Sequence, residues 1–349
     1  MSKISKIFIR RKSIDWTERG VISWVADIAS TCKSASNIHP KGFNQLMELY
    51  SEPGRIYFSL AARSRAASCT PDERSEIDNQ LFYARTLIEN SMIRVISQDM
   101  DPFHDLIFKR GFFGYSIKQG VTVRFPLITC KPTEKCGGGC YAHDGRDKHL
   151  SSISRGVFNF LAVRHLKNNT SSNVSASNLL AFNNQIDKAI NFAKIDARNA
   201  ESSGFSRRPR IRLSHVGEMA AFPEFTNWLA QQIFDRSGGE VDSIIYTRHP
   251  NAYRLDTKSI VVNFTVESDI DERIKFVPKG AHLVASSWGG HAYESVSVNF
   301  LEHHGRTNFQ MTGNGPTCPV TANHELTPTC DTARCTLCFT NNRSHTNFD

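Results

Sequence analysis

Six short apolar segments recur in the last two thirds of the chain, and they constrain its fold more than any other feature. Their β-branched and aromatic content is typical of strands. The predicted strands lie at 121–128, 210–214, 243–247, 259–266, 282–286 and 295–301. Helical periodicity lies between several of them, at 153–166, at 179–197 and from Pro223 onward. Strands that alternate with helices favour parallel βα units, so we predict an α/β fold. A partial (β/α) barrel with parallel strands is our first expectation, while a complete barrel or a doubly wound sheet stays open.

The residues before this region follow a different pattern. Residues 70–97 predict a long helix, because Thr70 can cap its start, Pro71 suits its first position and Glu73 completes a capping box. We therefore predict three parts of the chain. These are a mainly helical N-terminal region at 1–118, a β/α core with a cysteine loop at 119–305, and a cysteine-rich segment at 306–349. The N-terminal region contains no motif that we can attach to chemistry.

The composition argues against several classes of protein. Of the 349 residues, 40% are hydrophobic and 22% are charged, which provides for a sizeable core and argues against disorder. No apolar stretch approaches the ~18 residues of a membrane span, and the basic N-terminus lacks the apolar run of a secretory signal. We expect a cytoplasmic protein without a membrane partner. The net charge of +8 weakly favours an anionic partner such as nucleic acid.

Nine cysteines need a separate explanation. Disulfides are rare in a reducing compartment, so clustered thiols indicate metal or catalytic sites. Seven of the nine form two groups, which are Cys130, Cys136 and Cys140, and then Cys318, Cys330, Cys335 and Cys338. We predict that both groups bind metal.

The first group follows the first predicted strand of the core, in a βα loop. In both candidate folds, sites form at the carboxyl ends of parallel strands. Gly137, Gly138 and Gly139 let the backbone wrap closely around a bound object. Three thiolates can hold three irons of a [4Fe–4S] cluster and leave the fourth iron open for a ligand.

Three cysteines after the first strand of a β/α barrel, with Tyr141 beside the last of them, resemble the radical S-adenosylmethionine (SAM) enzymes. The resemblance implies that Cys130, Cys136 and Cys140 bind a [4Fe–4S] cluster and that SAM chelates its open iron, with Tyr141 at the cofactor. The gaps of five and three residues between the cysteines are longer than in the usual family pattern. The ending Cys140-Tyr141-Ala142 is similar to that of phage-encoded variants.

A turn after the second predicted strand supports this resemblance. Radical SAM enzymes typically carry a Gly-Gly-Glu-like turn there, which contacts the amino group of SAM. Gly217-Glu218 is similar, with Val216 in place of the first glycine. The resemblance therefore implies that Gly217 and Glu218 bind the cofactor. The alternative is that Glu218 only lies near a helix N-terminus, where acidic side chains are favoured.

The four C-terminal cysteines form a complete thiolate set within residues 318–338, and the last two form a C-x-x-C pair. Such a set suits structural zinc or a fully ligated iron–sulfur cluster. Zinc ribbons usually carry two C-x-x-C pairs, so a single pair slightly favours iron. The Cys-Tyr-Ala loop together with this ending resembles an uncharacterised phage "gene product" family. That resemblance implies a phage or mobile-element origin and no particular substrate.

Polar segments also follow other predicted strands and would face the same edge of the sheet. They are residues 246–249, 267–269 and 286–291, and the simpler interpretation of each is an ordinary βα loop.

Taken together, these observations lead us to expect a radical SAM-like iron–sulfur enzyme, with an electron donor as a partner. The basic charge mildly favours a nucleic-acid or nucleotide substrate. The C-terminal cysteines would hold a second iron–sulfur cluster or zinc. Two alternatives stay open. One is a zinc-stabilised basic protein that binds nucleic acid without catalysis, with an affinity that falls steeply with salt. The other is an iron–sulfur redox protein that does not use SAM.

Overall fold

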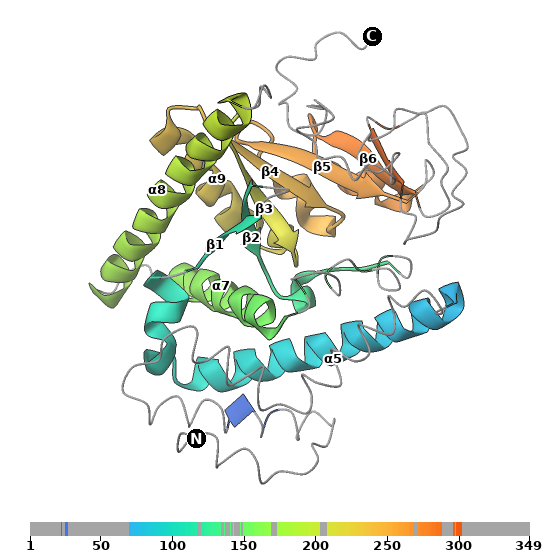
Figure 1. Ribbon diagram of the computed structural model, residues 1–349, viewed down its shortest axis with the longest axis horizontal. Coiled ribbons are helices and arrows are strands. Elements are labelled where there is room, and N and C mark those ends of the chain that lie inside the picture. The colour runs from blue at the N-terminus through green and yellow to red at the C-terminus, as the bar shows by residue number, and fades with distance from the viewer. Residues whose placement is uncertain are drawn as a thin grey trace. The chain divides into compact units, whose positions relative to one another are not determined.

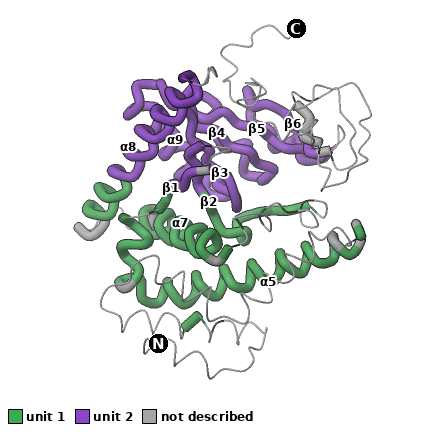
Figure 2. Tube along the Cα trace, in the orientation of Figure 1, with its two compact units in different colours: residues 1–112, 124–182 green, residues 113–123, 183–349 purple. Residues whose placement is uncertain are grey.

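The computed structural model divides the chain into two compact units (Figure 2). Unit 1 comprises residues 1–112 and 124–182, and unit 2 comprises residues 113–123 and 183–349. The residues that the structure describes are 22, 25–26, 70–109, 111–116, 120–133, 136, 140, 142, 147, 149–168, 173–202, 208–267, 271–287, 296 and 298–301. The expected domain boundaries after residues 118 and 305, and the whole segment 306–349, lie outside the described residues.

Unit 2 is built on a mixed sheet, which in the described part of the chain has seven strands (Figure 1). The strands are β1 (Phe113–Ser116), β2 (Gly120–Arg124), β3 (Arg210–Val216), β4 (Asp242–Thr247), β5 (Ile260–Val266), β6 (His282–Ser287) and β7 (Val298–Leu301). β1 pairs with β2 in antiparallel orientation, while the successive pairs from β3–β4 to β6–β7 are parallel. All six predicted strands are present, and the predicted α/β class is confirmed.

The strands lie side by side in the order in which they occur in the sequence. A doubly wound sheet instead reverses its strand order at a switch point. The described sheet runs from β1 to β7 without such a reversal. All seven residues of β5 are buried, as is usual for a central parallel strand that is covered on both faces.

The first core strand is shorter than the sequence predicts. β2 ends at Arg124, and a 3₁₀ turn, η3 (Leu127–Thr129), follows where we expected the strand to continue to residue 128. Pro126 explains the difference, because proline has no N–H to donate to a strand ladder. This residue is the N-cap of η3. The chain therefore leaves the sheet just before the cysteine loop.

The connections between the parallel strands differ in their content. Helix α9 (Pro223–Ser237) joins β3 to β4 and ends at Gly238, which adopts a left-handed φ of 66°. Among the described residues, the connection from β4 to β5 contains η6 (Pro250–Arg254) and that from β5 to β6 contains η7 (Glu272–Phe276), with no α-helix in either. The predicted alternation of strands with helices therefore holds for β3 and β4, while 3₁₀ turns replace helices further along.

The described part of unit 1 is mainly helical. Helix α5 (Pro71–Gln98) begins with the predicted capping box, in which Thr70 and Glu73 bond to each other's backbone N–H. It packs with η3 and with α7 (Leu150–Asn168), and short turns η1 (Asp101–Phe103) and η2 (Asp105–Lys109) follow it. Buried apolar side chains of α5 and α7 share one core. The predicted helices at 70–97 and 153–166 are confirmed.

Helix α8 (Asn173–Ser202) starts in unit 1 and continues in unit 2. It contains the predicted helix at 179–197 and extends beyond it at both ends. Within the described residues, no helix is both long enough and apolar enough to cross a membrane.

Candidate functional site

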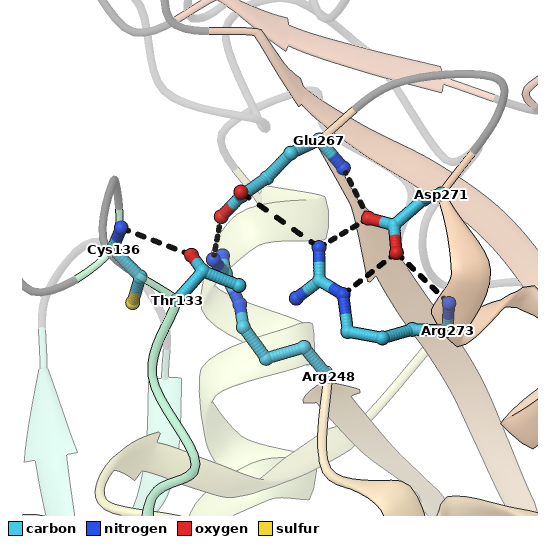
Figure 3. A network of polar contacts seen from close by, with 6 residues as sticks. All are labelled: Thr133, Cys136, Arg248, Glu267, Asp271 and Arg273. Atoms are coloured by element: carbon cyan, nitrogen blue, oxygen red, sulfur yellow. Dashed lines mark hydrogen bonds and ion pairs between the residues drawn. The ribbon is translucent and has the colours of Figure 1, made fainter.

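The first cysteine group lies in unit 1, directly after η3. Cys130 is the C-cap of η3, and its N–H donates to the carbonyl of Leu127 at 2.9 Å. The N–H of Cys136 donates to the hydroxyl of Thr133 at 3.1 Å (Figure 3). Cys130 and Cys136 are half-buried, whereas Cys140 is buried, with 8% of its surface exposed. The loop therefore begins at the end of η3, and its last cysteine, Cys140, is buried.

The electrostatic surroundings of Cys140 favour its neutral thiol when no cation is bound. Burial raises the pKa of Cys140 to about 12, and the charges of Cys136 and Asp78 act in the same direction. The backbone N–H of Ala142 and the charge of Arg85 oppose them. A cation at these sulfurs would stabilise thiolates, because positive charge lowers a thiol pKa.

Soft sulfur donors suit iron–sulfur clusters or zinc, so the chemistry of the loop fits the predicted cluster. Among the described residues, however, no group of three or more His, Cys, Asp and Glu side chains stands ready to hold a metal ion. Ligation by Cys130, Cys136 and Cys140 stays a prediction. The other predicted ligands, Cys318, Cys330, Cys335 and Cys338, and the predicted cofactor contact Tyr141 lie outside the described residues.

Two buried charged side chains of α5 contact the chain on either side of the cysteine loop. The Nε of Arg85 lies 3.0 Å from Oε1 of Glu89, and the two side chains are 1% and 0% exposed. Arg85 Nη1 also donates to the carbonyl of Ala142 at 2.7 Å and to that of Asp147 at 3.1 Å. Glu89 Oε2 accepts from the N–H of Ile128 at 3.2 Å. The pair thus contacts the backbone on both sides of the three cysteines.

The burial of this pair also affects its acid–base behaviour. Burial raises the pKa of Glu89 above its ordinary value, although Arg85 and the N–H groups of Ile128 and Leu127 act against that shift. Without the guanidinium and these two N–H groups, a fully buried carboxylate would be strongly disfavoured. The contacts of Glu89 and the position of the loop therefore depend on each other.

Two further contacts fix the segments that flank the loop. Arg124, the last residue of β2, donates from Nε to the carboxylate of Asp147 at 3.0 Å. Gly156 of α7 lies against the backbone of Phe125, where an added Cβ would come within 2.9 Å of the carbonyl carbon. Glycine is required there because the helix and the chain that enters the loop approach each other too closely for a side chain.

The predicted Gly217-Glu218 turn lies in unit 2, at the carboxyl end of β3. Gly217 adopts a φ of 71°, a region that favours glycine. Glu218 is only 6% exposed and caps the short turn η5 (Met219–Ala221). Its Oε1 accepts from the N–H of Ala220 at 3.4 Å and from the hydroxyl of Ser214 at 3.5 Å. Part of its role is therefore to cap this turn, as the alternative interpretation expected.

Glu218 is nevertheless more than an ordinary capping residue. Burial raises its pKa to about 7, although the Thr247 hydroxyl and the N–H of Ala220 donate to it and the charge and N–H of Arg248 also favour the carboxylate. An exposed capping carboxylate has no such cost of desolvation. A buried acid that titrates near neutrality, at the carboxyl end of a parallel strand, is a candidate functional group.

Charged residues also gather where β4 and β5 end, at the same edge of the sheet (Figure 3). Arg248 donates from Nη1 to Glu267 Oε1 at 2.8 Å. Arg273 lies 3.8 Å from the other carboxylate oxygen of Glu267 and donates from Nε to Asp271 at 2.8 Å. Asp271 also accepts from the N–H of Glu267 at 3.1 Å. This network connects the residue after β5, Glu267, with Arg248, Asp271 and Arg273.

The structure thus brings some predicted residues together within unit 2. Glu218 lies beside Thr247 and Arg248, and Arg248 is paired with Glu267, as their positions after parallel strands led us to expect. Of the two polar segments predicted at 267–269 and 286–291, residues 268–269 and 288–291 lie outside the described residues. The cysteine loop belongs to unit 1 and the Glu218 turn to unit 2.

Sequence reasoning missed Arg85 and Glu89. Asp78, Arg85 and Glu89 are all buried on α5 and are spaced by seven and four residues, which places them on one helix face. Charged residues that share a face at this spacing, within a helix that also carries buried apolar residues, are a detectable signal. The N-terminal region therefore carries residues that contact the site, although it contains no motif.

Comparison of the chain with protein-family models, with curated proteins and with solved structures gives no match.

Proposed function

We propose that this protein is a radical SAM-like iron–sulfur enzyme built on a partial (β/α) barrel. Sequential strand order is the order of strands in such a barrel, and the polar turns lie at the carboxyl ends of its parallel strands. Cys130, Cys136 and Cys140 would hold the cluster, and Gly217 and Glu218 would bind SAM. When bound, the cluster and SAM supply one-electron reduction and a carbon radical, which is chemistry that protein side chains lack.

The observation that carries the proposal is the buried Glu218 carboxyl group after β3. Its hydrogen-bond partners on the protein, Ser214, Ala220 and Thr247, hold it in one orientation. An ammonium group that reaches this carboxyl favours its ionised form and gains a charge-assisted hydrogen bond. Such a bond to a charged group contributes about 1.5–3 kcal/mol. The amino group of SAM has the required charge and donors.

The cysteine loop supports the proposal through its charge balance. Three thiolates with a cluster form an anionic group, and the buried guanidinium of Arg85 lies where its charge favours the thiolate of Cys140. Arg85 would therefore offset part of the negative charge that the loop gains on binding. The Cys318, Cys330, Cys335 and Cys338 set would bind a second cluster or zinc, and an electron donor would reduce the first cluster. The net charge of +8 favours a nucleic-acid or nucleotide substrate.

Metal content and SAM affinity of the anaerobically purified full-length protein test the proposal. We expect about four irons or more per chain, with an electron paramagnetic resonance spectrum of the reduced protein that changes when SAM is added. Glu218→Gln should weaken SAM binding roughly tenfold or more, since one charge-assisted bond is lost. Glu224→Gln, at an exposed glutamate in the first turn of α9, is the matched control and should bind SAM as the wild type does.

Three results would count against the proposal. Zinc without iron after iron-replete expression would replace it with a zinc-stabilised protein, to be tested for salt-dependent nucleic-acid binding. Iron without any spectral response to SAM would indicate a redox or electron-transfer protein. Equal SAM affinity of the wild type and Glu218→Gln would remove Glu218 from the cofactor site.

A further inference from the structure

We infer that Arg85 and Glu89 of α5 are positioning residues that hold both ends of the Cys130–Cys140 loop in register for its ligand. The inference deepens the proposed function and rests on it, because it takes this loop to be the metal site. It assigns a role at the site to the N-terminal helical region, in which the sequence shows no chemical motif.

Arg85 and Glu89 contact the backbone just outside the two ends of the loop. Glu89 accepts from the N–H of Ile128, two residues before Cys130. Arg85 donates to the carbonyl of Ala142, two residues after Cys140. One helical turn of α5 therefore contacts the chain just before the first cysteine and just after the last one. The span between these contacts contains all three predicted ligands.

The contact of Arg85 with Ala142 and the contact of Glu89 with Ile128 depend on each other. Arg85 Nε and Glu89 Oε1 lie 3.0 Å apart, so the two side chains form one ion-paired unit. Both are almost completely buried, and bidentate or multiply bonded guanidinium groups have few alternative positions. A shift of either end of the loop would leave a buried charge without part of its hydrogen bonding, which is strongly unfavourable.

An ion pair that fixes both ends of the loop favours ligand binding. Bringing the two ends of a flexible loop together costs conformational entropy. When the ends are already fixed, ligand binding does not carry this cost of closure, and the affinity is higher accordingly. An apolar pair of similar size can replace a buried ion pair with little loss of stability, but it cannot bond to Ile128 N–H and Ala142 C=O. The double substitution therefore removes the positioning bonds without leaving an uncompensated buried charge.

The test compares the wild type with the double variant Arg85→Met with Glu89→Leu in the full-length chain. The matched control is Asp105→Leu with Lys109→Met, which removes an exposed ion pair of the same spacing elsewhere in unit 1. Glu89→Gln is the conservative variant, because its amide oxygen can still accept from Ile128. If the double variant does not fold, the single variant Arg85→Met carries the test, because it removes the bond to Ala142 C=O while the buried Glu89 can take up a proton.

The first measurement uses the metal-free protein. Amide hydrogen exchange at residues 127–130 and alkylation of Cys140 by iodoacetamide, both resolved by mass spectrometry, should rise at least tenfold in the double variant. Glu89→Gln should show a smaller rise, and the control pair none. Unchanged exchange and alkylation in a folded double variant, or in Arg85→Met when the double variant is unfolded, would overturn the inference.

The second measurement is iron bound per chain after anaerobic reconstitution with iron and sulfide. We expect the folded double variant to retain less than half of the wild-type iron, and the control pair to retain all of it. A loosened loop with undiminished iron uptake would overturn the positioning role. Absence of iron in the wild type itself would instead be a failure of the proposed function. The metal-free measurement keeps these two failures distinct.

Discussion

Arg248 donates from Nη1 to Glu267 Oε1 at 2.8 Å and thereby ties the loop after β4 to the loop after β5. The side chains are 18% and 12% exposed, so water screens their charges only in part. Arg273 lies 3.8 Å from the second oxygen of Glu267. One carboxylate therefore lies between two guanidinium groups at the carboxyl edge of the sheet, next to the residues that contact Glu218.

The first prediction follows from this arrangement. Glu267→Ala should lower the free energy of unfolding by about 3 kcal/mol, because it leaves two partly buried cations without their shared carboxylate. Glu224→Ala, which removes an exposed partner of Arg254, should change stability by less than about 1 kcal/mol. Urea unfolding followed by circular dichroism measures both values. Similar effects of the two substitutions would show that the pair at the sheet edge is no more important than a surface ion pair.

The raised pKa of Glu218 leads us to expect a distinct dependence of stability on pH. Its pKa is raised from the usual range to about 7 in the folded protein. The folded state therefore binds a proton at Glu218 more tightly than the unfolded state does. The stability that this proton contributes is fully present below about pH 4.5 and is lost as the pH rises through about 7. At pH 8, Glu218→Gln should be more stable than the wild type by roughly 3 kcal/mol. At pH 4.5 the two proteins should be nearly equal.

Thermal unfolding of both proteins from pH 4.5 to pH 8 checks this prediction. In the variant, the part of the change of stability with pH that comes from Glu218 should disappear, while the parts that come from other titrating groups remain. Parallel curves for the two proteins would mean that Glu218 titrates in the folded state as it does in the unfolded state.

Substitution of Gly156 should cause a steric clash with the chain that enters the cysteine loop. A Cβ at this position would lie 2.9 Å from the carbonyl carbon and 3.0 Å from the carbonyl oxygen of Phe125. Backbone atoms cannot move aside as a flexible side chain can, so Gly156→Ala should destabilise the protein by about 2–3 kcal/mol. At an open helix position the same change stabilises by roughly 1 kcal/mol.

Gly238→Ala is the comparison that separates steric contact from backbone strain. Its Cβ would meet nothing within 4 Å, but the residue has a φ of +66°. The expected loss is about 1–2 kcal/mol, from the left-handed conformation alone. Urea unfolding of both variants provides the measurement. A larger loss at Gly238 than at Gly156 would contradict the close approach of α7 to Phe125.

The capping box of α5 gives a fourth prediction. Thr70 accepts from the N–H of Glu73, and the Glu73 carboxylate accepts from the N–H of Thr70 at 3.0 Å. Thr70→Ala should cost about 1 kcal/mol. Thr86→Ala, the same substitution in the interior of α5, should be neutral or slightly stabilising because alanine is the better helix former. Equal effects at the two positions, measured by thermal unfolding, would rule out a specific role for the cap.

The sequence alone was sufficient for the features that depend on local physics. The capping box at Thr70 and Glu73 predicts the start of α5 because its partners lie three residues apart. Apolar runs predict the six core strands, and glycine at Gly217 and Gly238 agrees with the left-handed turns found there. The position of Glu218 after a parallel strand could likewise be predicted, because neighbouring parallel strands end at the same edge.

Only the tertiary structure decided the features that depend on distant partners. The order of the strands, the antiparallel β1 and the replacement of helices by 3₁₀ turns follow from how the whole sheet packs. Arg85 reaches Ala142 across 57 positions of sequence. No periodicity indicates which backbone groups a buried charge will bind, because that choice is made when two segments pack together and exclude water. The cysteines could therefore be recognised from the sequence, whereas the residues that hold their loop could not.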